Sequence, residues 1–98
     1  MEYLHYEFDA TPLEVVEVTL DHAANVQLLD EENFQNYRDH KRFDYHGGYA
    51  QTSPFRLKPP YAGRWHLVVD LGGGAGSVRA SLQIIPQALA SSDSLTPA

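Results

Sequence analysis

Residues 63–71, GRWHLVVDL, constrain the fold more than any other stretch of the chain. Apolar and polar residues alternate along this stretch. One side of an extended chain would carry Trp65, Leu67, Val69 and Leu71, and the other Arg64, His66, Val68 and Asp70. Clusters of Pro and Gly precede and follow it, over residues 59–63 and 72–76. A period of two between two turn clusters predicts a half-buried strand, and the only tryptophan of the chain marks it as central to the core.

Similar short periodic runs fill most of the remaining chain. They predict strands over residues 2–9, 13–20, 25–29, 43–49, 53–58 and 77–85. Residues 43–49 should form an irregular strand that is interrupted at Gly47 and Gly48. Residues 21–24 and 72–76 are short enough to serve as hairpin turns.

Residues 31–38 have a helical pattern instead. Asp30 can cap the N-terminus, and Glu31 and Glu32 would lie in the first turn. Phe34 and Tyr37 are three residues apart and share one side of such a helix. We expect one or two helical turns that close an end of the fold.

About seven strands at intervals of roughly ten residues are typical of two packed antiparallel sheets. The fold class expected is therefore all-β: a small antiparallel β-sandwich, jelly-roll-like, with one short helix. Residues 1–86 should form this single domain. Residues 87–98, QALASSDSLTPA, are small, polar and aperiodic, which predicts a disordered tail.

The composition bears on how the fold is stabilised and on where the protein is located. The chain has no cysteine, so it cannot form disulfides or thiolate metal sites, and packing must stabilise it. The first ten residues lack the basic and apolar regions of a signal peptide, and no run approaches the roughly 18 apolar residues of a membrane span. These features predict a soluble cytoplasmic protein without a membrane partner.

The net charge of −6 is unevenly distributed. Residues 1–37 contain nine acids and no Lys or Arg, whereas residues 38–79 contain all seven bases and three acids. Acidic early strands that pair with basic late strands would form cross-strand ion pairs. The alternative is a bipolar surface that attracts a charged partner or a second copy of the chain.

The outward residues of three late strands suggest a binding face. They are Arg56, Lys58, Arg64, His66 and Arg79. If their strands are neighbours in one sheet, they would form a basic patch for a protein partner or a small anionic ligand. Neutralisation by Glu14, Glu17 or Asp70 is the alternative. Duplex nucleic acid is disfavoured as a partner because the molecule as a whole is acidic.

A second candidate is a set of aromatic and amide side chains in the loops. Its members are Asn33, Tyr37, Tyr45 and Tyr49, with Asn36 and Tyr61 nearby in the pattern. Tyrosines and asparagines of this kind form carbohydrate or peptide grooves, although they also cap the ends of sandwiches without binding anything.

Catalytic and metal motifs are absent from the sequence. It contains no G-x-S-x-G and no H-E-x-x-H, and the spacing of His40, Asp44 and His46 matches no recurring metal site. We therefore expect a protein that is not an enzyme, with no cofactor and no metal.

Several pieces of the chain together resemble a known family. They are Leu28-Leu29-Asp30, Asn33-Phe34, Asn36-Tyr37, Tyr45-His46-Gly47-Gly48, Ser53-Pro54, Gly63-Arg64-Trp65, Val68-Val69-Asp70 and Val78-Arg79-Ala80-Ser81. In order and spacing, over residues 3–86, they resemble the bacterial domain of unknown function 1883, which is similar in outline to pre-peptidase C-terminal domains. The resemblance implies a compact β-sandwich, alone or joined to TIR-type signalling domains, and it brings no catalytic residue.

These observations predict a recognition or accessory domain that binds a protein or a small anionic ligand. One alternative is a structural domain that self-associates through its acidic and basic strands and forms salt-dependent dimers. A third is a carbohydrate-binding domain that uses the aromatic loops.

Overall fold

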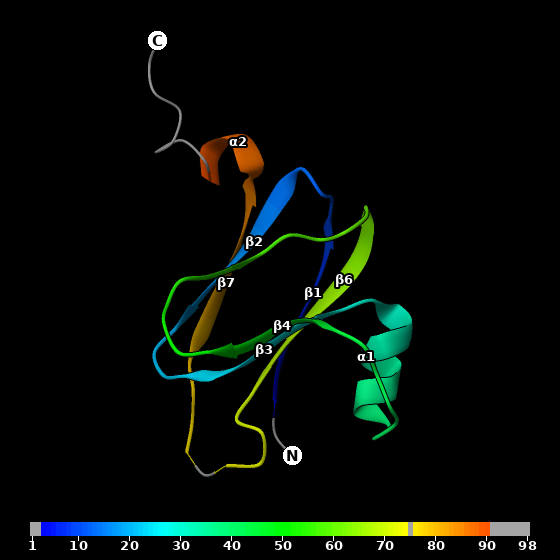
Figure 1. Ribbon diagram of the computed structural model, residues 1–98, viewed down its shortest axis with the longest axis vertical. Coiled ribbons are helices and arrows are strands. Elements are labelled where there is room, and N and C mark those ends of the chain that lie inside the picture. Colours follow the sequence, from blue (N-terminus) through cyan, green and yellow to red (C-terminus); the bar gives the residue numbers. More distant parts are fainter. Residues whose placement is uncertain (1–2, 75, 91–98) are drawn as a thin grey trace.

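The computed structural model describes residues 3–74 and 76–90 and contains seven strands and two helices in this part of the chain (Figure 1). The elements are β1 (Tyr3–Ala10), β2 (Glu14–Leu20), β3 (Ala24–Leu29), α1 (Glu31–Arg38), β4 (His46–Ala50), β5 (Phe55–Leu57), β6 (Gly63–Asp70), β7 (Ala80–Pro86) and α2 (Gln87–Ala90). The predicted strands and helix are all present, and most boundaries agree within three residues.

The strands form two antiparallel sheets. The first has the order β1-β6-β3-β4 and the second the order β5-β2-β7. The strand around Trp65 is β6, which lies between β1 and β3, with Phe8 opposite Trp65 and Leu28 opposite Leu67. The sequence therefore predicted correctly both the all-β sandwich and the central position of this strand.

The core lies between the two sheets. Trp65, Leu67 and Val69 of β6 are buried there against Val16 and Val18 of β2. The Trp65 indole donates a hydrogen bond from Nε1 to the Tyr61 carbonyl at 3.1 Å, so its polar atom is satisfied inside an apolar region. Burial of each such large side chain stabilises the fold by about 1.5–3 kcal/mol.

The outer face of the first sheet is covered as well, and here the expectation for His66 is wrong. Helix α1 packs on this face, beside β6 in Figure 1, and does not close an end of the sandwich. Phe34 and Tyr37 form a second apolar cluster with Leu29 and Val68. Because α1 lies over it, the outer face of β6 is buried at His66, Val68 and Asp70, and only Arg64 at its start is exposed as expected.

The start of α1 follows the prediction. The Asp30 carboxylate accepts a hydrogen bond from the backbone N–H of Asn33 at 2.8 Å, which is the geometry of an N-cap. Glu31 and Glu32 lie in the first turn, where a negative charge is favourable. Asn33 also accepts a hydrogen bond from the Asp44 N–H at 2.8 Å, which fixes the segment after α1 against the helix.

Two expected hairpins instead connect the sheets. Residues 21–24 lead from β2 in one sheet to β3 in the other, and residues 71–79 lead from β6 to β7 in the same way. Asp21 joins these connections, since its carboxylate accepts a hydrogen bond from the Arg79 N–H at 2.7 Å. Turn residues signal a reversal of the chain but do not say which sheet receives the next strand.

Two further segments differ from expectation. β4 runs through Gly47 and Gly48 without interruption, and a Cβ on Gly47 would lie 2.1 Å from the Val26 carbonyl oxygen, so only glycine fits there. The expected tail begins with helix α2, where the Gln87 N–H donates to the Leu13 carbonyl at 2.8 Å. Residues 91–98 of that expected tail lie outside the described residues.

Candidate functional site

The five residues of the expected basic face do not lie together. Arg56 and Lys58 lie on or beside β5, at the edge of the second sheet, whereas Arg64 and His66 lie on β6 in the first sheet. Arg79 lies in the connection before β7. The expectation of one shared sheet is wrong, because β6 pairs with β1 and β3 rather than with its neighbours in sequence.

Two of these arginines are paired with acids from early strands. Arg56 donates to Glu17 of β2 at 3.0 Å, and Arg64 contacts both Glu7 and Asp9 of β1. The neighbouring carboxylates raise the pKa of Arg64 further above its already high ordinary value. The cross-strand ion pairs expected from the charge distribution are therefore present, and they use acids that a bipolar surface would have left exposed.

The aromatic candidates divide into buried and exposed residues. Tyr37 is buried on the side of α1 that packs against the sheet, and Asn33 is hydrogen-bonded within the helix cap, so neither belongs to an open groove. The exposed fractions of Tyr45, Tyr49 and Tyr61 are 47%, 60% and 45%. Tyr61 lies against Trp65 at the end of the core, with ring centroids 4.8 Å apart.

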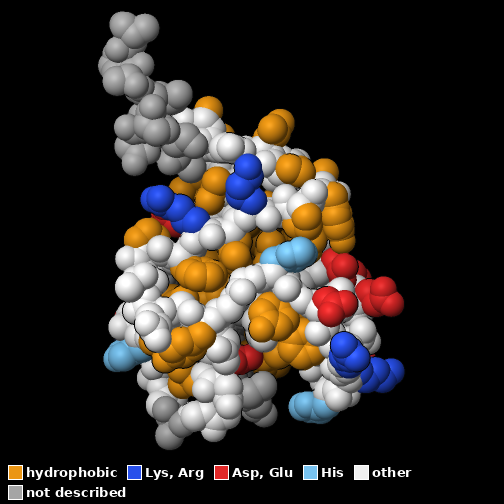
Figure 2. Space-filling view, viewed as in Figure 1, with side chains coloured by type: hydrophobic (Ala, Val, Ile, Leu, Met, Phe, Trp, Pro, Cys, Tyr) orange, Lys and Arg blue, Asp and Glu red, His pale blue; other side chains and the backbone are white. Residues whose placement is uncertain are grey.

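Tyr49 lies on β4, and Tyr45 directly before it, at an edge of the first sheet away from the strands that α1 packs on, β6 and β3. β4 is an edge strand that pairs only with β3, and Tyr49 stands opposite Asn25. Tyr45, directly before β4, packs against Phe43 with ring centroids 5.8 Å apart. Figure 2 shows hydrophobic side chains over β4, with Lys and Arg side chains nearby at the end of α1. We call Tyr45, Tyr49 and the β4 edge the tyrosine edge.

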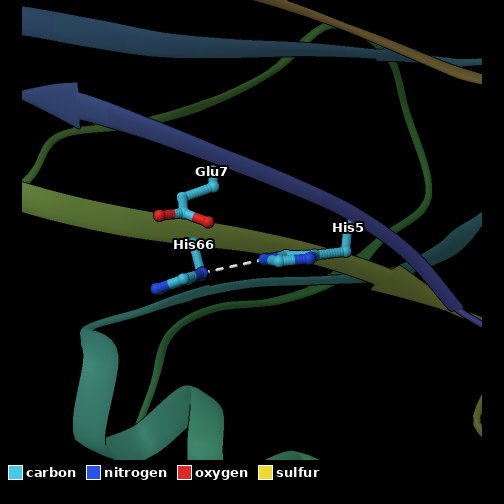
Figure 3. Close-up of side chains that lie close together, drawn as sticks. All are labelled: His5, Glu7 and His66. Atoms are coloured by element: carbon cyan, nitrogen blue, oxygen red, sulfur yellow. Dashed lines mark hydrogen bonds between the residues drawn. The ribbon is translucent and has the colours of Figure 1, made fainter.

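A third cluster was not singled out from the sequence. His5 and Glu7 of β1 and His66 of β6 point to the same side of the first sheet, toward α1 (Figure 3). One ligand atom from each of the three side chains lies within 4.8 Å of the others. His5 and Glu7 are exposed, whereas His66 is only 2% exposed. We call His5, Glu7 and His66 the histidine cluster.

Aromatic stacking and hydrogen bonds fix the two imidazoles. Phe34 of α1 lies parallel to His66 with centroids 4.4 Å apart and stacks on His5 at 4.1 Å. His5 Nε2 lies 2.8 Å from His66 Nδ1, and His66 Nε2 lies 2.7 Å from Glu31 Oε1. Glu31 lies in the first turn of α1, directly after the helix cap. The cap, the aromatic stack on Phe34 and the histidine pair are therefore connected through α1.

The protonation states follow from these contacts. The hydrogen bonds from Gln35 and His66 lower the pKa of Glu31, so this carboxylate is ionised and can only accept. His66 therefore donates to Glu31 through Nε2–H, and one hydrogen joins His66 Nδ1 and His5 Nε2. Burial and the neighbouring His66 lower the pKa of His5, which favours its neutral form.

A buried carboxylate lies at the other end of the same face. Asp70, 3% exposed, accepts hydrogen bonds from Tyr37 Oη at 2.7 Å, Asn25 Nδ2 at 2.9 Å and the Gly72 N–H at 2.9 Å. Burial and the Asp70 carboxylate raise the pKa of Tyr37 well above its ordinary value, so the phenol stays protonated. All three hydrogen bonds join Asp70 to other residues of this chain. The contacts of Asp70 are therefore those of a residue with a structural role.

A cavity of about 660 Å³ opens beside Asp70 at the end of the sandwich. Its lining is formed by glycines and apolar residues of the β6–β7 connection, together with Tyr3 and Leu4 of β1. Asp70 is its only acidic lining residue among those described, and its oxygens are already bonded within the chain. Besides Asp70, the polar side chains of its described lining are the hydroxyls of Tyr3 and Ser77, so the cavity is of mixed polarity.

Sequence reasoning missed the histidine cluster for a definite reason. The alternation along residues 2–9 places His5 and Glu7 on the same side of a strand, and the alternation along residues 63–71 assigns His66 to one side of another. The pairing of β1 with β6 places Glu7 opposite His66 and is a long-range contact. Neither alternation pattern contains information about this pairing.

The two sheets, the helix on one outer face and the exposed tyrosines define a small β-sandwich domain with exposed aromatic side chains along the edge strand β4. The chain belongs to the family described as Domain of unknown function (DUF1883), which matches residues 1–88. The comparisons with curated proteins and with solved structures found no match. No helix among residues 3–74 and 76–90 is long and apolar enough to cross a membrane.

Proposed function

We propose that this chain is a non-catalytic recognition domain, and that it binds an extended acidic segment of a partner protein along the tyrosine edge. The observation that carries the proposal is the exposure of Tyr45 and Tyr49 along an edge strand, in a sheet whose other described aromatic side chains are largely covered. The absence of cysteine is consistent with a reducing, cytosolic setting for this role.

The edge of β4 provides the backbone part of such a site. β3 occupies one side of the strand, so the N–H and C=O groups on the other side are free to pair with an added strand. Tyr45 and Tyr49 are four residues apart and therefore fall on the same face of the extended chain. An added strand would receive main-chain hydrogen bonds from β4 and side-chain contacts from the two rings.

Charge supports an acidic occupant. Residues 38–44 contain three bases, Arg38, Lys41 and Arg42, against two acids, Asp39 and Asp44. The segment is thus net positive in a chain whose net charge is −6. Among the described residues, the three bases form no ion pair with a carboxylate, in contrast to Arg56 and Arg64. Positive charge next to an open edge increases the rate of encounter with an acidic segment.

Selection from a random peptide library tests the proposal, because it samples acidic, basic and neutral segments alike. We expect acidic peptides to be enriched, and their affinity to fall as salt rises. The double variant Tyr45→Ala/Tyr49→Ala should weaken binding at least about tenfold, since exposed tyrosines dominate such contacts. Leu13→Ala is the matched control, because Leu13 is 75% exposed but lies before β2, away from β4.

The alternatives predict other results. If no peptide is enriched, or if the double variant binds the selected peptides as well as the wild type, the proposal is wrong. Retention of oligosaccharides that depends on Tyr45 and Tyr49 would indicate carbohydrate recognition instead. A molecular mass that doubles at low salt in light scattering would indicate self-association, even though many of the charges of the early strands are already paired within the chain.

A further inference from the structure

We infer that the histidine cluster is a binding site for a divalent transition metal of the Zn²⁺ class, with His5, Glu7 and His66 as the protein ligands. This site lies under the first turn of α1 and is separate from the tyrosine edge. Two imidazoles and one carboxylate are the nitrogen and oxygen donors that Zn²⁺ uses when it keeps a fourth position for water.

The two imidazoles are already directed at a common point. In the metal-free arrangement a hydrogen of His5 Nε2 lies between the two nitrogens, which are 2.8 Å apart. Zn–N bonds of about 2.0–2.1 Å in tetrahedral geometry place two ligand nitrogens about 3.3 Å apart. A separation of roughly 0.5 Å more would admit the ion, and His5 can supply it because β1 is an edge strand and the ring is exposed.

One pair of tautomers suits the metal. A proton on His66 Nε2, hydrogen-bonded to Glu31, leaves a lone pair on His66 Nδ1. A neutral His5 would carry its proton on Nδ1, which leaves Nε2 free for the metal. The ion thereby replaces the hydrogen that joins the two rings, and no proton needs to leave either imidazole.

The groups around the cluster are those that hold metal ligands in place. Glu31 accepts the hydrogen of His66 Nε2, which is the carboxylate–histidine pairing found behind many metal ligands. Phe34 stacks on both imidazoles and restricts their rotation. Arg64 contacts Oε2 of Glu7, which leaves Oε1 for a metal. Arg64 is therefore both a neighbour of the site and a competitor for its carboxylate.

Titration of the whole purified chain with Zn²⁺ in a calorimeter tests the inference. We expect one ion per chain, and ¹⁵N spectra of the imidazoles should show His5 converted to the Nδ1–H tautomer. His5→Ala should weaken binding at least about 100-fold, and Glu31→Gln about 10- to 100-fold. His66→Ala is a poorer test, because this buried ring also packs on Phe34.

Two variants of one ion pair separate a metal site from a general surface effect. Glu7→Gln removes a ligand and should weaken Zn²⁺ binding at least about tenfold, whereas Arg64→Gln frees the same carboxylate and should strengthen binding. Both remove the Glu7–Arg64 pair, and Arg64→Gln also removes the Arg64–Asp9 pair, so the unfolding free energy of each variant is measured alongside. His22→Ala, which changes an exposed histidine outside the cluster, should leave the affinity unchanged.

Any of three results would overturn the inference. The first is that the wild type binds no stoichiometric ion, and the second is that His5→Ala binds the ion as well as the wild type does. The third is that Glu7→Gln and Arg64→Gln change the affinity in the same direction. Circular dichroism of each variant would establish that a loss of binding is not a loss of fold.

Discussion

From Trp65 to Asp70 both faces of β6 are buried, but they are stabilised differently. On the inner face, Trp65, Leu67 and Val69 pack against the second sheet. On the outer face, His66 and Asp70 lie under α1 with Val68 between them. The inner face is held by apolar burial, which has no directional requirement, whereas the outer face depends on hydrogen bonds that must each find a partner.

The difference arises from what covers each face. A second sheet supplies a full layer of apolar side chains to the inner face. Helix α1 has eight residues and buries only Phe34 and Tyr37. Polar side chains therefore remain on the outer face. His66 is bonded to Glu31 and His5, and Asp70 to Tyr37, Asn25 and Gly72, whereas the buried Gln27 Oε1 on the same face has no hydrogen-bond partner among the described residues. A short helix over a sheet leaves polar side chains on that face, whereas a full layer of apolar side chains would exclude them.

The largest effect is expected on the inner face. Trp65→Ala should lower the free energy of unfolding by about 3–5 kcal/mol, because it leaves a large cavity between the sheets. Urea unfolding followed by circular dichroism measures the loss. Trp65→Phe retains most of the ring volume and should cost much less. A loss below about 1 kcal/mol for Trp65→Ala would show that the second sheet can close over the cavity.

Removal of a single hydroxyl group from the outer face should lower the free energy of unfolding. Tyr37→Phe removes a hydrogen bond to the buried Asp70 carboxylate and should cost about 1.5–3 kcal/mol of unfolding free energy, since bonds to charged groups are the stronger ones. Tyr6→Phe is a matched control: its hydroxyl donates to the neutral Ala80 carbonyl, so its loss should cost about 0.5–1.5 kcal/mol. Equal losses in the two variants would contradict a special contribution from the buried charge on the outer face.

Helix α1, which covers the outer face, can be destabilised without changing the inner core. Asp30→Ala removes the N-cap of α1 and should cost about 1 kcal/mol. Hydrogen exchange should accelerate at the Asn33 amide, which loses its acceptor, and leave the β2 amides nearly unchanged. Glu32→Ala keeps the cap and serves as the control. If exchange at β2 accelerated as strongly, α1 and the inner core would unfold as one unit.

A small effect is expected in a connection that belongs to neither face. The backbone hydrogen bond from Arg79 lowers the pKa of Asp21 below its ordinary value of 3.8, so folding favours the ionised carboxylate. The stability that this provides is present above pH 3.8 and is lost as the pH falls through the lower pKa of the folded state. Asp21→Asn should reduce the decline in unfolding free energy below about pH 4, as measured by urea unfolding at several pH values. An unchanged decline would assign the acid sensitivity to other carboxylates.

The sequence predicted local structure well and assembly poorly. The alternation in residues 63–71 correctly placed Trp65, Leu67 and Val69 in the core, and the pattern at Asp30 and Glu31 correctly predicted the start of α1. The basic face failed because a period of two assigns a residue to a side of a strand and not to a sheet. His66 was expected to contact solvent because nothing in residues 63–71 indicates that α1 lies over them.

The sequence by itself determined the elements: seven short periodic runs, one capped helix, no cysteine and a separation of acids from bases. Local sterics, caps and alternation act between residues that are close in the chain, so they can be recognised there. The tertiary structure alone decided that β1 pairs with β6, that α1 covers the outer face of β6 and β3 and that β4 lies at an edge of the sheet. These pairings bring His5 to His66, 61 positions further along the chain, because the burial of both faces of one strand is a property of the whole chain and of no single segment.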